Sequence, residues 1–281
     1  MKNIMALIDG SIYAKSVCDH AAWLSQSTEA AIDLVHVLGR RETQSDLSGS
    51  IGLGARTALL EELSELDAQK SQLAQKRGRL LLDEASNQLT SAGVEQIITR
   101  LRHGDVVETV QALENEADVI VIGKRGEAAD FARLHLGSNL ERVVRSTTKP
   151  VLVASRAFKP IERVLIAYDG GESAKKAIGY IAGSPVSKGK SFTLLTVGTE
   201  TPENQQSLKF AAKTLTAAGL EAECLTLQGQ ADIVIAAQIE SGSFDLLAMG
   251  AYGHSRIRNL IIGSTTTEMI RFALVPVLLF R

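Results

Sequence analysis

The sequence predicts an α/β protein with two tandem five-stranded, mostly parallel sheets, helices on both faces and a Rossmann-like arrangement. Three observations support this prediction. Apolar strand-like runs alternate with helical patterns throughout the chain, and the pattern of the first half returns in the second. Strands that alternate with helices form parallel sheets with right-handed crossovers. The third observation is the length of 281 residues, which exceeds the usual size of one domain.

The internal duplication is visible at the start and the end of each half. Residues 4–10 and 164–170 are both apolar runs that end in Asp-Gly, and residues 149–153 resemble residues 275–279 around a shared Pro-Val-Leu. We therefore predict a first domain over 1–156 and a second over 162–281. The segment between them is short, so we expect the two halves to pack together.

In the first half, apolar runs predict strands, and segments with apolar residues at helical spacing predict the helices between them. The strands are expected near 3–9, 31–38, 95–102, 118–123 and 150–155. The helices are expected near 12–26, 57–92, 105–116 and 138–147. The long helix carries Leu59, Leu63, Leu66, Leu73 and Leu80 at heptad-like spacing. We interpret this stripe as core or inter-domain packing rather than as a separate coiled coil.

The second half repeats the same order of elements. Strands are expected near 163–169, 191–197, 221–228, 245–250 and 275–280, and helices near 172–182, 203–218, 230–240 and 264–273. Ligands of such sheets bind beyond the carboxyl ends of the strands, at the switch in strand order. The Asp-Gly pairs and a glycine-rich loop in each half are all predicted at those ends.

Composition is that of an ordinary globular protein. Hydrophobic residues make up 45% of the chain and charged residues 22%, with a formal charge of −2, so charge predicts neither a nucleic-acid nor a membrane partner. No apolar run approaches the roughly 18 residues that span a bilayer, and no signal peptide precedes the first strand, so we expect a cytoplasmic protein. Cys18 and Cys224 lie far apart and are interpreted as buried bystanders without a disulfide.

The glycine loop of the second half points to a nucleotide. Gly250-Ala251-Tyr252-Gly253 follows a predicted strand, and after nine intervening residues Gly263-Ser264-Thr265 stands at the start of a predicted helix. Glycines let the backbone approach an anion, and the helix start directs free N–H groups and a positive dipole end at it. This loop therefore predicts a phosphate-binding site.

With the strand that ends in Asp169 and the closing Pro-Val-Leu strand, this pattern resembles the universal stress protein family, over both halves of the chain. The resemblance implies a fold like that of adenine-nucleotide α-hydrolases and, in members that bind ATP, a site in which the Asp and a Val of the second strand hold adenine and ribose. Carried over, it implies a second-domain site of Ala167, Asp169, Val197, Met249, Gly250, Gly253, Gly263, Ser264 and Thr265. It also implies that the closing strands 151–154 and 277–280 pair with each other within the chain.

The first half departs from the pattern by one residue. Ten residues, not nine, separate its glycine pair from the Gly-Ser that follows, and acidic residues enter the loop. We expect this site to be occupied less readily, with Lys124 available as a phosphate partner. The first-domain candidates are Asp9, Val37, Gly123, Gly126, Gly137 and Ser138.

No catalytic residue and no metal site can be assigned. The five histidines show no metal-ligand spacing, and no acidic residue near the glycine loop is an evident general base. The predicted function is a stress-response regulator that binds ATP, with AMP or ADP as alternatives and Mg²⁺ as a companion ion, without efficient hydrolysis. Two alternatives remain open: a slow ATPase or phosphotransferase, and a nucleotide-independent interaction protein. A protein partner is expected but not identified, and a homodimer stays open.

Overall fold

The computed structural model describes residues 1–39, 56–126, 138–242, 244–251 and 263–281, without the side chains of 56–60 and 138. The first half contains β1 (Asn3–Leu7), α1 (Ala14–Thr28), β2 (Ala31–Leu38), α2 (Arg56–Ser91), β3 (Ile97–His103), α3 (Val106–Leu113), the 3-10 turn η2 (Glu114–Glu116), β4 (Val119–Gly123), α4 (Ser138–Ser146) and β5 (Val151–Ala154). The expected elements of this half are present with small shifts at their ends.

The second half follows the same order. It contains β6 (Arg163–Ala167), α5 (Glu172–Gly183), the 3-10 turn η4 (Pro185–Ser187), β7 (Ser191–Val197), α6 (Pro202–Ala217), β8 (Ala222–Leu227), α7 (Ala231–Glu240), β9 (Leu246–Gly250), α8 (Ser264–Phe272) and β10 (Val277–Phe280). The α/β class and the alternation of strand and helix are confirmed.

All the described strands form one ten-stranded sheet in the order β3-β2-β1-β4-β5-β10-β9-β6-β7-β8. Pairs within each half are parallel, and β5 pairs with β10 antiparallel, with Leu152 opposite Leu278. The predicted pairing of the closing strands is therefore confirmed, and the two predicted sheets are continuous rather than separate. The physical reason is that each five-stranded sheet would otherwise end in an unpaired apolar edge.

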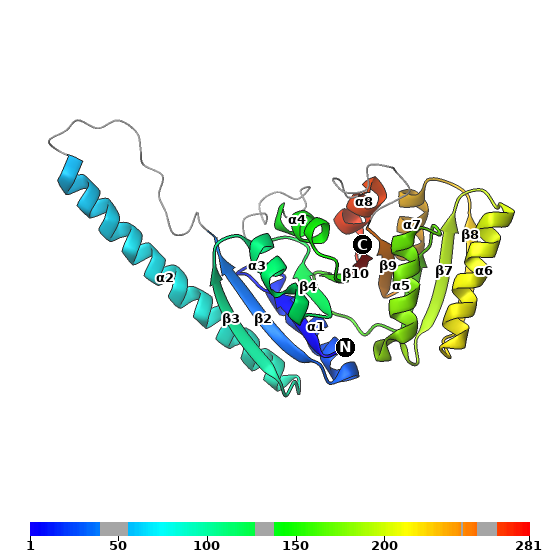
Figure 1. Cartoon of the computed structure of the whole chain (residues 1–281), viewed down its shortest axis with the longest axis horizontal. Coiled ribbons are helices and arrows are strands. Elements are labelled where there is room, and N and C mark those ends of the chain that lie inside the picture. Colours follow the sequence, from blue (N-terminus) through cyan, green and yellow to red (C-terminus); the bar gives the residue numbers. More distant parts are fainter. Residues whose placement is uncertain (40–55, 127–137, 243, 252–262) are drawn as a thin grey trace.

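Side chains that alternate along the strands build two cores. Ile4 and Ala6 face the layer of α1, α2, α5 and α6, whereas Met5 and Leu7 face α3, α4, α7 and α8. Each core cluster runs through both halves of the chain. Figure 1 shows the two halves side by side, with β5 and β10 meeting at the centre. The sheet therefore forms the shared middle layer of the molecule.

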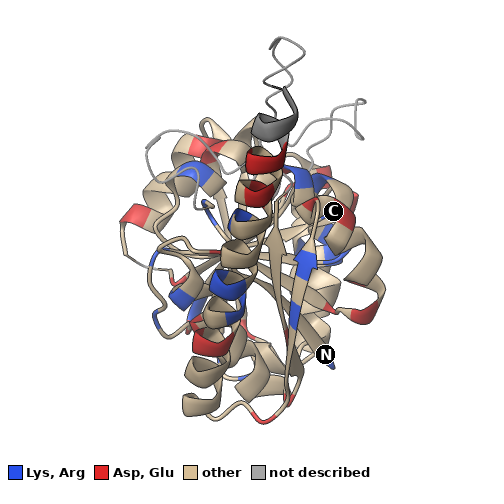
Figure 2. Ribbon diagram, turned by 90° about the vertical axis from the view of Figure 1, so that its left-hand side faces the viewer, with Lys and Arg blue, Asp and Glu red and all other residues tan. Residues whose placement is uncertain are grey.

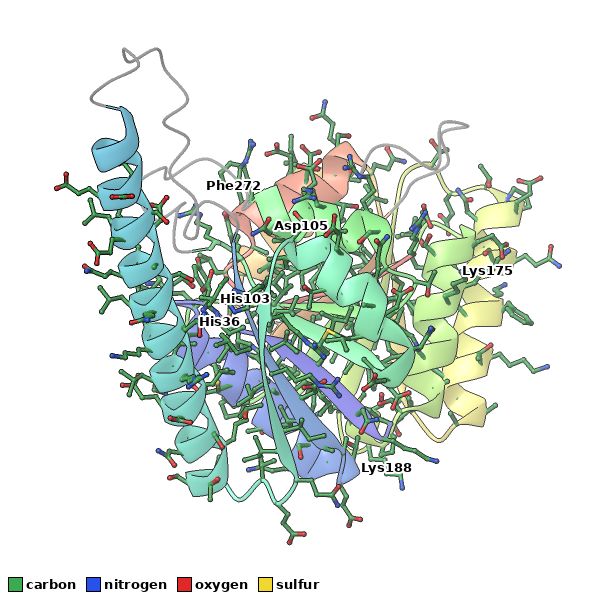
Figure 3. All side chains as sticks on the ribbon, turned by 60° about the vertical axis from the view of Figure 1, so that its left-hand side comes forward. His36, His103, Asp105, Lys175, Lys188 and Phe272 are labelled. Atoms are coloured by element: carbon green, nitrogen blue, oxygen red, sulfur yellow. The ribbon has the colours of Figure 1, made fainter. Side chains whose placement is uncertain are left out.

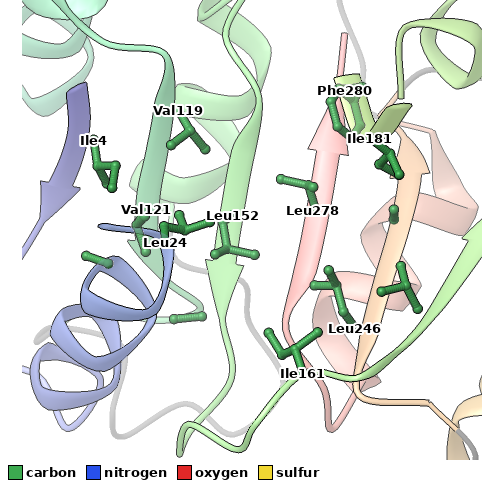
Figure 4. Packing of buried hydrophobic residues seen from close by; sticks show 14 of the residues in the cluster. Ile4, Leu24, Val119, Val121, Leu152, Ile161, Ile181, Leu246, Leu278 and Phe280 are labelled. Carbon is green, nitrogen blue, oxygen red and sulfur yellow. The ribbon is translucent and has the colours of Figure 1, made fainter. Parts of the chain in front are cut away.

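The seam between the halves is packed with apolar side chains. Leu152, Leu278 and Ile161 belong to one cluster there, as Figure 4 shows. The linker also docks, because the ring of Phe158 meets His20 edge-on at 5.1 Å and Lys190 Nζ donates to the Ile161 carbonyl at 2.6 Å. The expectation that the halves pack together is confirmed.

The leucine stripe of α2 does not lie where the sequence predicted. Leu82, Ala85 and Leu89 are the buried residues that anchor this helix to the sheet, whereas Leu66, Leu73 and Leu80 are 44%, 64% and 63% exposed. A seven-residue repeat stays on one side of a helix, and here that side is turned away from the residues that pack on the sheet. The interpretation of these three leucines as core packing is wrong.

The two cysteines are in different environments. Cys18 in α1 is buried, and burial, the largest cause, raises the pKa of its thiol to about 12. Cys224 is exposed, because it lies on β8 at an edge of the sheet, so the expectation that both thiols are buried is wrong for this one. Across the described part of the chain, no helix is both long and apolar enough to cross a bilayer.

Candidate functional site

An aspartate closes the first strand of each half in the same turn. Asp169 Oδ1 accepts a hydrogen bond of 2.9 Å from the Gly171 amide, and Asp9 Oδ1 accepts one of 3.0 Å from the Ser11 amide. A carboxylate that bonds the amide two residues on makes a compact turn. Both turns follow the strand at which the strand order switches, β1 between β2 and β4 and β6 between β7 and β9. The duplication is thus repeated in the geometry of the strand ends, where sheets of this kind hold ligands.

The carboxyl ends of β6, β7 and β9 bring together five of the predicted residues. Ala167 pairs in register with Leu195 of β7 and with Met249 of β9. Val197 comes two residues after Leu195, and Asp169, which is exposed, comes two residues after Ala167. The side chains of Ala167, Val197 and Met249 all contribute to the core below α7 and α8. Together with Gly250 at the end of β9, these residues lie at the carboxyl ends of neighbouring strands.

Helix α8 begins against the end of β9. The Gly263 amide donates to the Ala251 carbonyl at 3.2 Å, and Thr266 Oγ1 donates to the Gly250 carbonyl at 3.2 Å. Gly263 is the N-cap residue and makes no side-chain cap, while the Ser264 side chain beside it is exposed. The first N–H groups of a helix lack intrahelical partners and favour an anion. Gly263, Ser264 and Thr265 therefore lie at the start of α8, next to the carboxyl end of β9. Gly253 lies outside the described residues.

Thr266 is a residue that sequence reasoning missed. Its side chain is 3% exposed and holds the first turn of α8 on the strand end. The corresponding position of the first half, counted from the Gly-Ser pair, is Leu140. Comparing the repeats position by position could have identified it, because a threonine in place of a buried leucine needs a hydrogen-bond partner.

The glycines at the strand ends have a packing role beyond the predicted approach to an anion. A Cβ atom added to Gly250 would lie 2.9 Å from Ser173 Cβ at the start of α5. A Cβ atom added to Gly123 would lie 2.8 Å from Tyr13 Cβ, just before α1. Such distances are shorter than real carbon contacts, so both positions require glycine to bring helix and strand end together.

The first-half site is only partly assembled by the described residues. A Cβ atom on Gly126 would lie 3.0 Å from Asp9 Oδ2, so Gly126 sits over that carboxylate. Val37 is the next-to-last residue of β2 and lies two residues beyond Val35, which pairs in register with Leu7. Gly137 lies outside the described residues. Ser138 begins α4, and its side chain is not described.

Lys124 points across the seam instead of toward the strand end of its own half. Its Nζ donates a hydrogen bond of 3.0 Å to the carbonyl of Ala273, the C-cap residue that follows α8. Burial, followed by repulsion from Arg125, lowers the pKa of Lys124 to about 8. In this arrangement the amine is a contact between the halves, which corrects the expectation of Lys124 as a phosphate partner.

Two described polar side chains near the strand ends, His36 and Thr196, bond backbone carbonyls just after the neighbouring strand. His36 Nδ1 lies 2.8 Å from the Ile8 carbonyl, and Thr196 Oγ1 donates to the Tyr168 carbonyl at 3.0 Å in the equivalent place of the second half. Figure 3 shows His36 and His103 on β2 and β3, with Asp105 at the start of α3. No group of three or more His, Cys, Asp or Glu side chains suited to a metal ion occurs among the residues that the structure describes.

A cavity of about 40 Å³ lies where the middle of the sheet meets α1, α5 and η4, at the seam between the halves. Its apolar lining includes Val119, Val164 and Leu246, which begin or nearly begin their strands. It is therefore separate from the carboxyl ends that carry the candidate site.

Comparisons with known proteins all point to one family, and they cover both halves of the chain. The model of the universal stress protein family matches residues 1–155 and 198–281. A universal stress protein of Synechocystis sp. is 40% identical over the full length of both chains. Among solved structures, a universal stress protein from Archaeoglobus fulgidus has a TM-score of 0.70 and 22% identity, covering 99% of this chain and 96% of its own. A Pseudomonas aeruginosa structure described as a putative universal stress protein has a TM-score of 0.63 and 14% identity, covering 100% of this chain and 93% of its own, so both structures support the fold.

Proposed function

This chain belongs to the universal stress protein family, and on that premise we propose that it is a stress-response regulator that binds an adenine nucleotide. ATP is the proposed ligand, and residues 162–281 form the domain that holds it chiefly, with 1–156 as the other domain. The proposed binding residues of the second domain are Ala167, Asp169, Val197, Met249, Gly250, Gly253, Gly263, Ser264 and Thr265.

The observation that carries this proposal is the link between α8 and β9. The hydrogen bonds from the Gly263 amide to Ala251 and from Thr266 to Gly250 keep the start of α8 at the carboxyl end of the sheet. A helix start typically stabilises an anion by about 0.3–1 kcal/mol, and the absence of a side chain on Gly263 leaves room for phosphate oxygens. The Ser264 hydroxyl, exposed at the same point, would donate a further hydrogen bond.

The nucleoside would lie on the other side of the site, at β6 and β7. A carboxylate accepts hydrogen bonds from ribose hydroxyls and repels phosphate, so Asp169 favours the sugar at the end of β6. The half-buried Val197 offers an apolar contact for the adenine ring. Buried Met249 and half-buried Ala167 would contribute mainly through their backbones. This orientation puts the phosphates toward Ser264.

The second domain is the favoured site because its loop keeps the nine-residue spacing and Thr266 bonds the start of its helix to β9. The first domain has Leu140 where the second has Thr266, and Lys124 is engaged with Ala273. Asp9, Val37, Gly123, Gly126, Gly137 and Ser138 remain the proposed residues of a weaker first-domain site.

The proposal is for regulation without efficient hydrolysis. At the carboxyl ends of the strands, the described residues offer backbone N–H donors and the carboxylate of Asp169. The described residues contain no group of three or more His, Cys, Asp or Glu side chains that could hold a metal ion, so any Mg²⁺ would be carried by the nucleotide. Occupancy of the α8 start would act on a helix whose other end contacts Lys124 of the first domain. Binding in one domain would thereby influence what both domains present to a protein partner.

Isothermal titration with ATP, ADP and AMP tests the proposal. We expect saturable binding that is weakened by Asp169→Ala and by Gly263→Val, which adds a side chain at the helix start. Asp83→Ala, a change of an exposed aspartate on α2, is the matched control and should bind like wild type. Circular dichroism would confirm that each variant folds. Absence of saturable binding to wild type would overturn the proposal.

Two further measurements test which domain binds the nucleotide and whether the protein hydrolyses it. Asp9→Ala should leave the tighter binding event in place, whereas Asp169→Ala should remove it; the reverse result would assign the main site to the first domain. Phosphate release with Mg²⁺ should be slow or absent. Turnover that Gly263→Val abolishes would instead identify an ATPase.

A further inference from the structure

Helix α2 is much longer than the surface it covers. Its 36 residues extend over about 54 Å at 1.5 Å per residue. Its buried side chains, Leu82, Ala85 and Leu89, all lie in the last third, and Gly78 approaches His36 and Leu101 just before them. Figure 1 shows the first part of α2 projecting beyond β3, away from the sheet. An isolated helical segment is marginally stable in water unless one face is packed.

The projecting part carries an unpartnered apolar stripe. Leu66, Leu73 and Leu80 are 44%, 64% and 63% exposed and recur every seven residues, so they lie nearly in one line about 21 Å long. Position 59, one repeat earlier, is also leucine. Leucines that recur every seven residues along one face are typical of a helix that packs against another helix.

The charges beside the stripe are separated along the helix. Glu61, Glu62 and Glu65 lie toward the projecting end, and Lys70, Lys76 and Arg79 follow, all of them exposed. Figure 2 shows this order on the helix nearest the viewer, with red segments toward its upper end and blue segments below them. Such a helix is complementary to a copy of itself that runs in the opposite direction.

We propose that the exposed stripe of α2 is the interface of a homodimer, in which the α2 helices of two copies pack antiparallel. A two-fold axis between residues 69 and 70 would place Leu66 opposite Leu73 of the second copy, and Leu80 opposite position 59. The same register brings Glu61 and Glu62 next to the basic group from Lys76 to Arg79. Parallel packing would instead set acidic residues against acidic and basic against basic, which disfavours it.

The dimer is independent of the pairing between β5 and β10. That pairing is satisfied within one chain, so assembly through α2 uses a different surface and a different element. The proposal also does not depend on nucleotide binding, because α2 contributes none of the proposed binding residues.

Sedimentation equilibrium of the full chain tests the dimer. We expect a mass of twice 30.1 kDa at high protein concentration. Leu73→Glu should raise the dissociation constant by at least about tenfold, since each dimer loses two buried leucines. Phe210→Glu, which changes a 67% exposed aromatic residue on α6, is the matched control and should leave the dimer intact. A monomer at all concentrations, or a dimer that Leu73→Glu leaves unchanged, would overturn the proposal.

Charge exchange tests the register. Glu62→Lys and Lys76→Glu should each weaken the dimer by about two- to fivefold, the size expected for an exposed ion pair. The double variant restores opposite charges across the interface and should recover wild-type affinity. Additive weakening in the double variant would contradict the antiparallel register.

Disulfide trapping tests the direction of packing. In a Cys224→Ser background, Gln69→Cys should oxidise to a covalent dimer, because the two copies of residue 69 meet at the axis. Glu62→Cys should not, since its two copies would be about 22 Å apart, far beyond disulfide reach. Cross-linking at residue 62 would establish parallel packing and refute the proposal.

Discussion

Lys124 Nζ and the carbonyl oxygen of Ala273 are joined by a hydrogen bond of 3.0 Å that crosses the seam between the halves. Lys124 follows β4 in the first half, and Ala273 is the C-cap residue of α8 in the second. Arg281 makes the converse contact, donating at 2.6 Å to the carbonyl of Arg145 in the last turn of α4. Cations at a helix C-terminus satisfy its last carbonyls and oppose its dipole. Each half therefore stabilises the last helix of the other.

The lowered pKa of Lys124 predicts a pH-dependent contribution to stability. Burial places the folded pKa near 8, below the unfolded value, so between these values the unfolded chain binds more protons. Relative to Lys124→Arg, which stays charged, wild type should gain stability as pH rises from 7 to 10, by on the order of 1 to 2 kcal/mol. Urea unfolding at several pH values measures this difference. A constant difference would contradict the burial of the ammonium group.

Asp105 should be an important helix cap. Its Oδ1 accepts hydrogen bonds from the Val107 and Glu108 amides at 2.8 and 3.3 Å, and its Oδ2 pairs with Arg142 at 2.8 Å. We expect Asp105→Ala to lower the free energy of unfolding by about 1 kcal/mol. Asp105→Asn, which can still cap α3, should cost less. Chemical denaturation of the three proteins makes the comparison, and equal losses in both variants would assign the effect to the ion pair.

The same aspartate predicts an acid-sensitive contribution. The hydrogen bond from Arg142, and then those from the two backbone amides, lower the pKa of Asp105. Its stabilisation is therefore complete above the unfolded pKa near 4 and is lost as pH falls through the lower folded value. The stability difference between wild type and Asp105→Ala should shrink on acidification below pH 4, which thermal unfolding would detect.

Two glycine substitutions should have opposite effects. Gly250→Ala would force a methyl group to 2.9 Å from Ser173 Cβ and should destabilise the protein by about 1–3 kcal/mol. Gly179, inside α5, has nothing within 4 Å of an added Cβ, so Gly179→Ala should stabilise by about 0.5–1 kcal/mol. Melting temperatures of both variants provide the test. A neutral Gly250→Ala would mean that the end of β9 can move away from α5.

The cysteines should react at very different rates. Cys224 is exposed, whereas Cys18 is 1% exposed and its thiol has a pKa of about 12. A thiol reagent at neutral pH should label one cysteine per native chain and two in urea, because the thiolate is the reactive form. Cys224→Ser should remove the fast reaction. Rapid labelling of that variant would indicate that α1 opens readily.

Much of this architecture follows from local patterns. Apolar runs such as 118–123 become β4 and helical spacing over 264–273 becomes α8, because strand and helix periodicities are written directly in the chain. The Asp-Gly after each first strand placed Asp9 and Asp169 at strand ends, and the structure adds the matched turns that they make.

Other features could not be predicted because they depend on contacts between distant segments. The amide of Gly263 and the hydroxyl of Thr266 find their carbonyl partners only when α8 has packed on β9. Whether Lys124 reaches toward an anion or toward Ala273 depends on the position of the other half.

The sequence by itself determined the α/β class, the duplication and the position of the glycine loops, because these rest on residue type and spacing. Tertiary structure alone decided which face of α2 is buried. A heptad of leucines specifies a line along a helix, but not whether that line turns to its own sheet or to solvent, and here Leu82, Ala85 and Leu89 occupy the sheet. The resemblance to the family already implied that β5 pairs with β10, and the packed chain shows that this pairing makes one continuous sheet of the two that the sequence predicted.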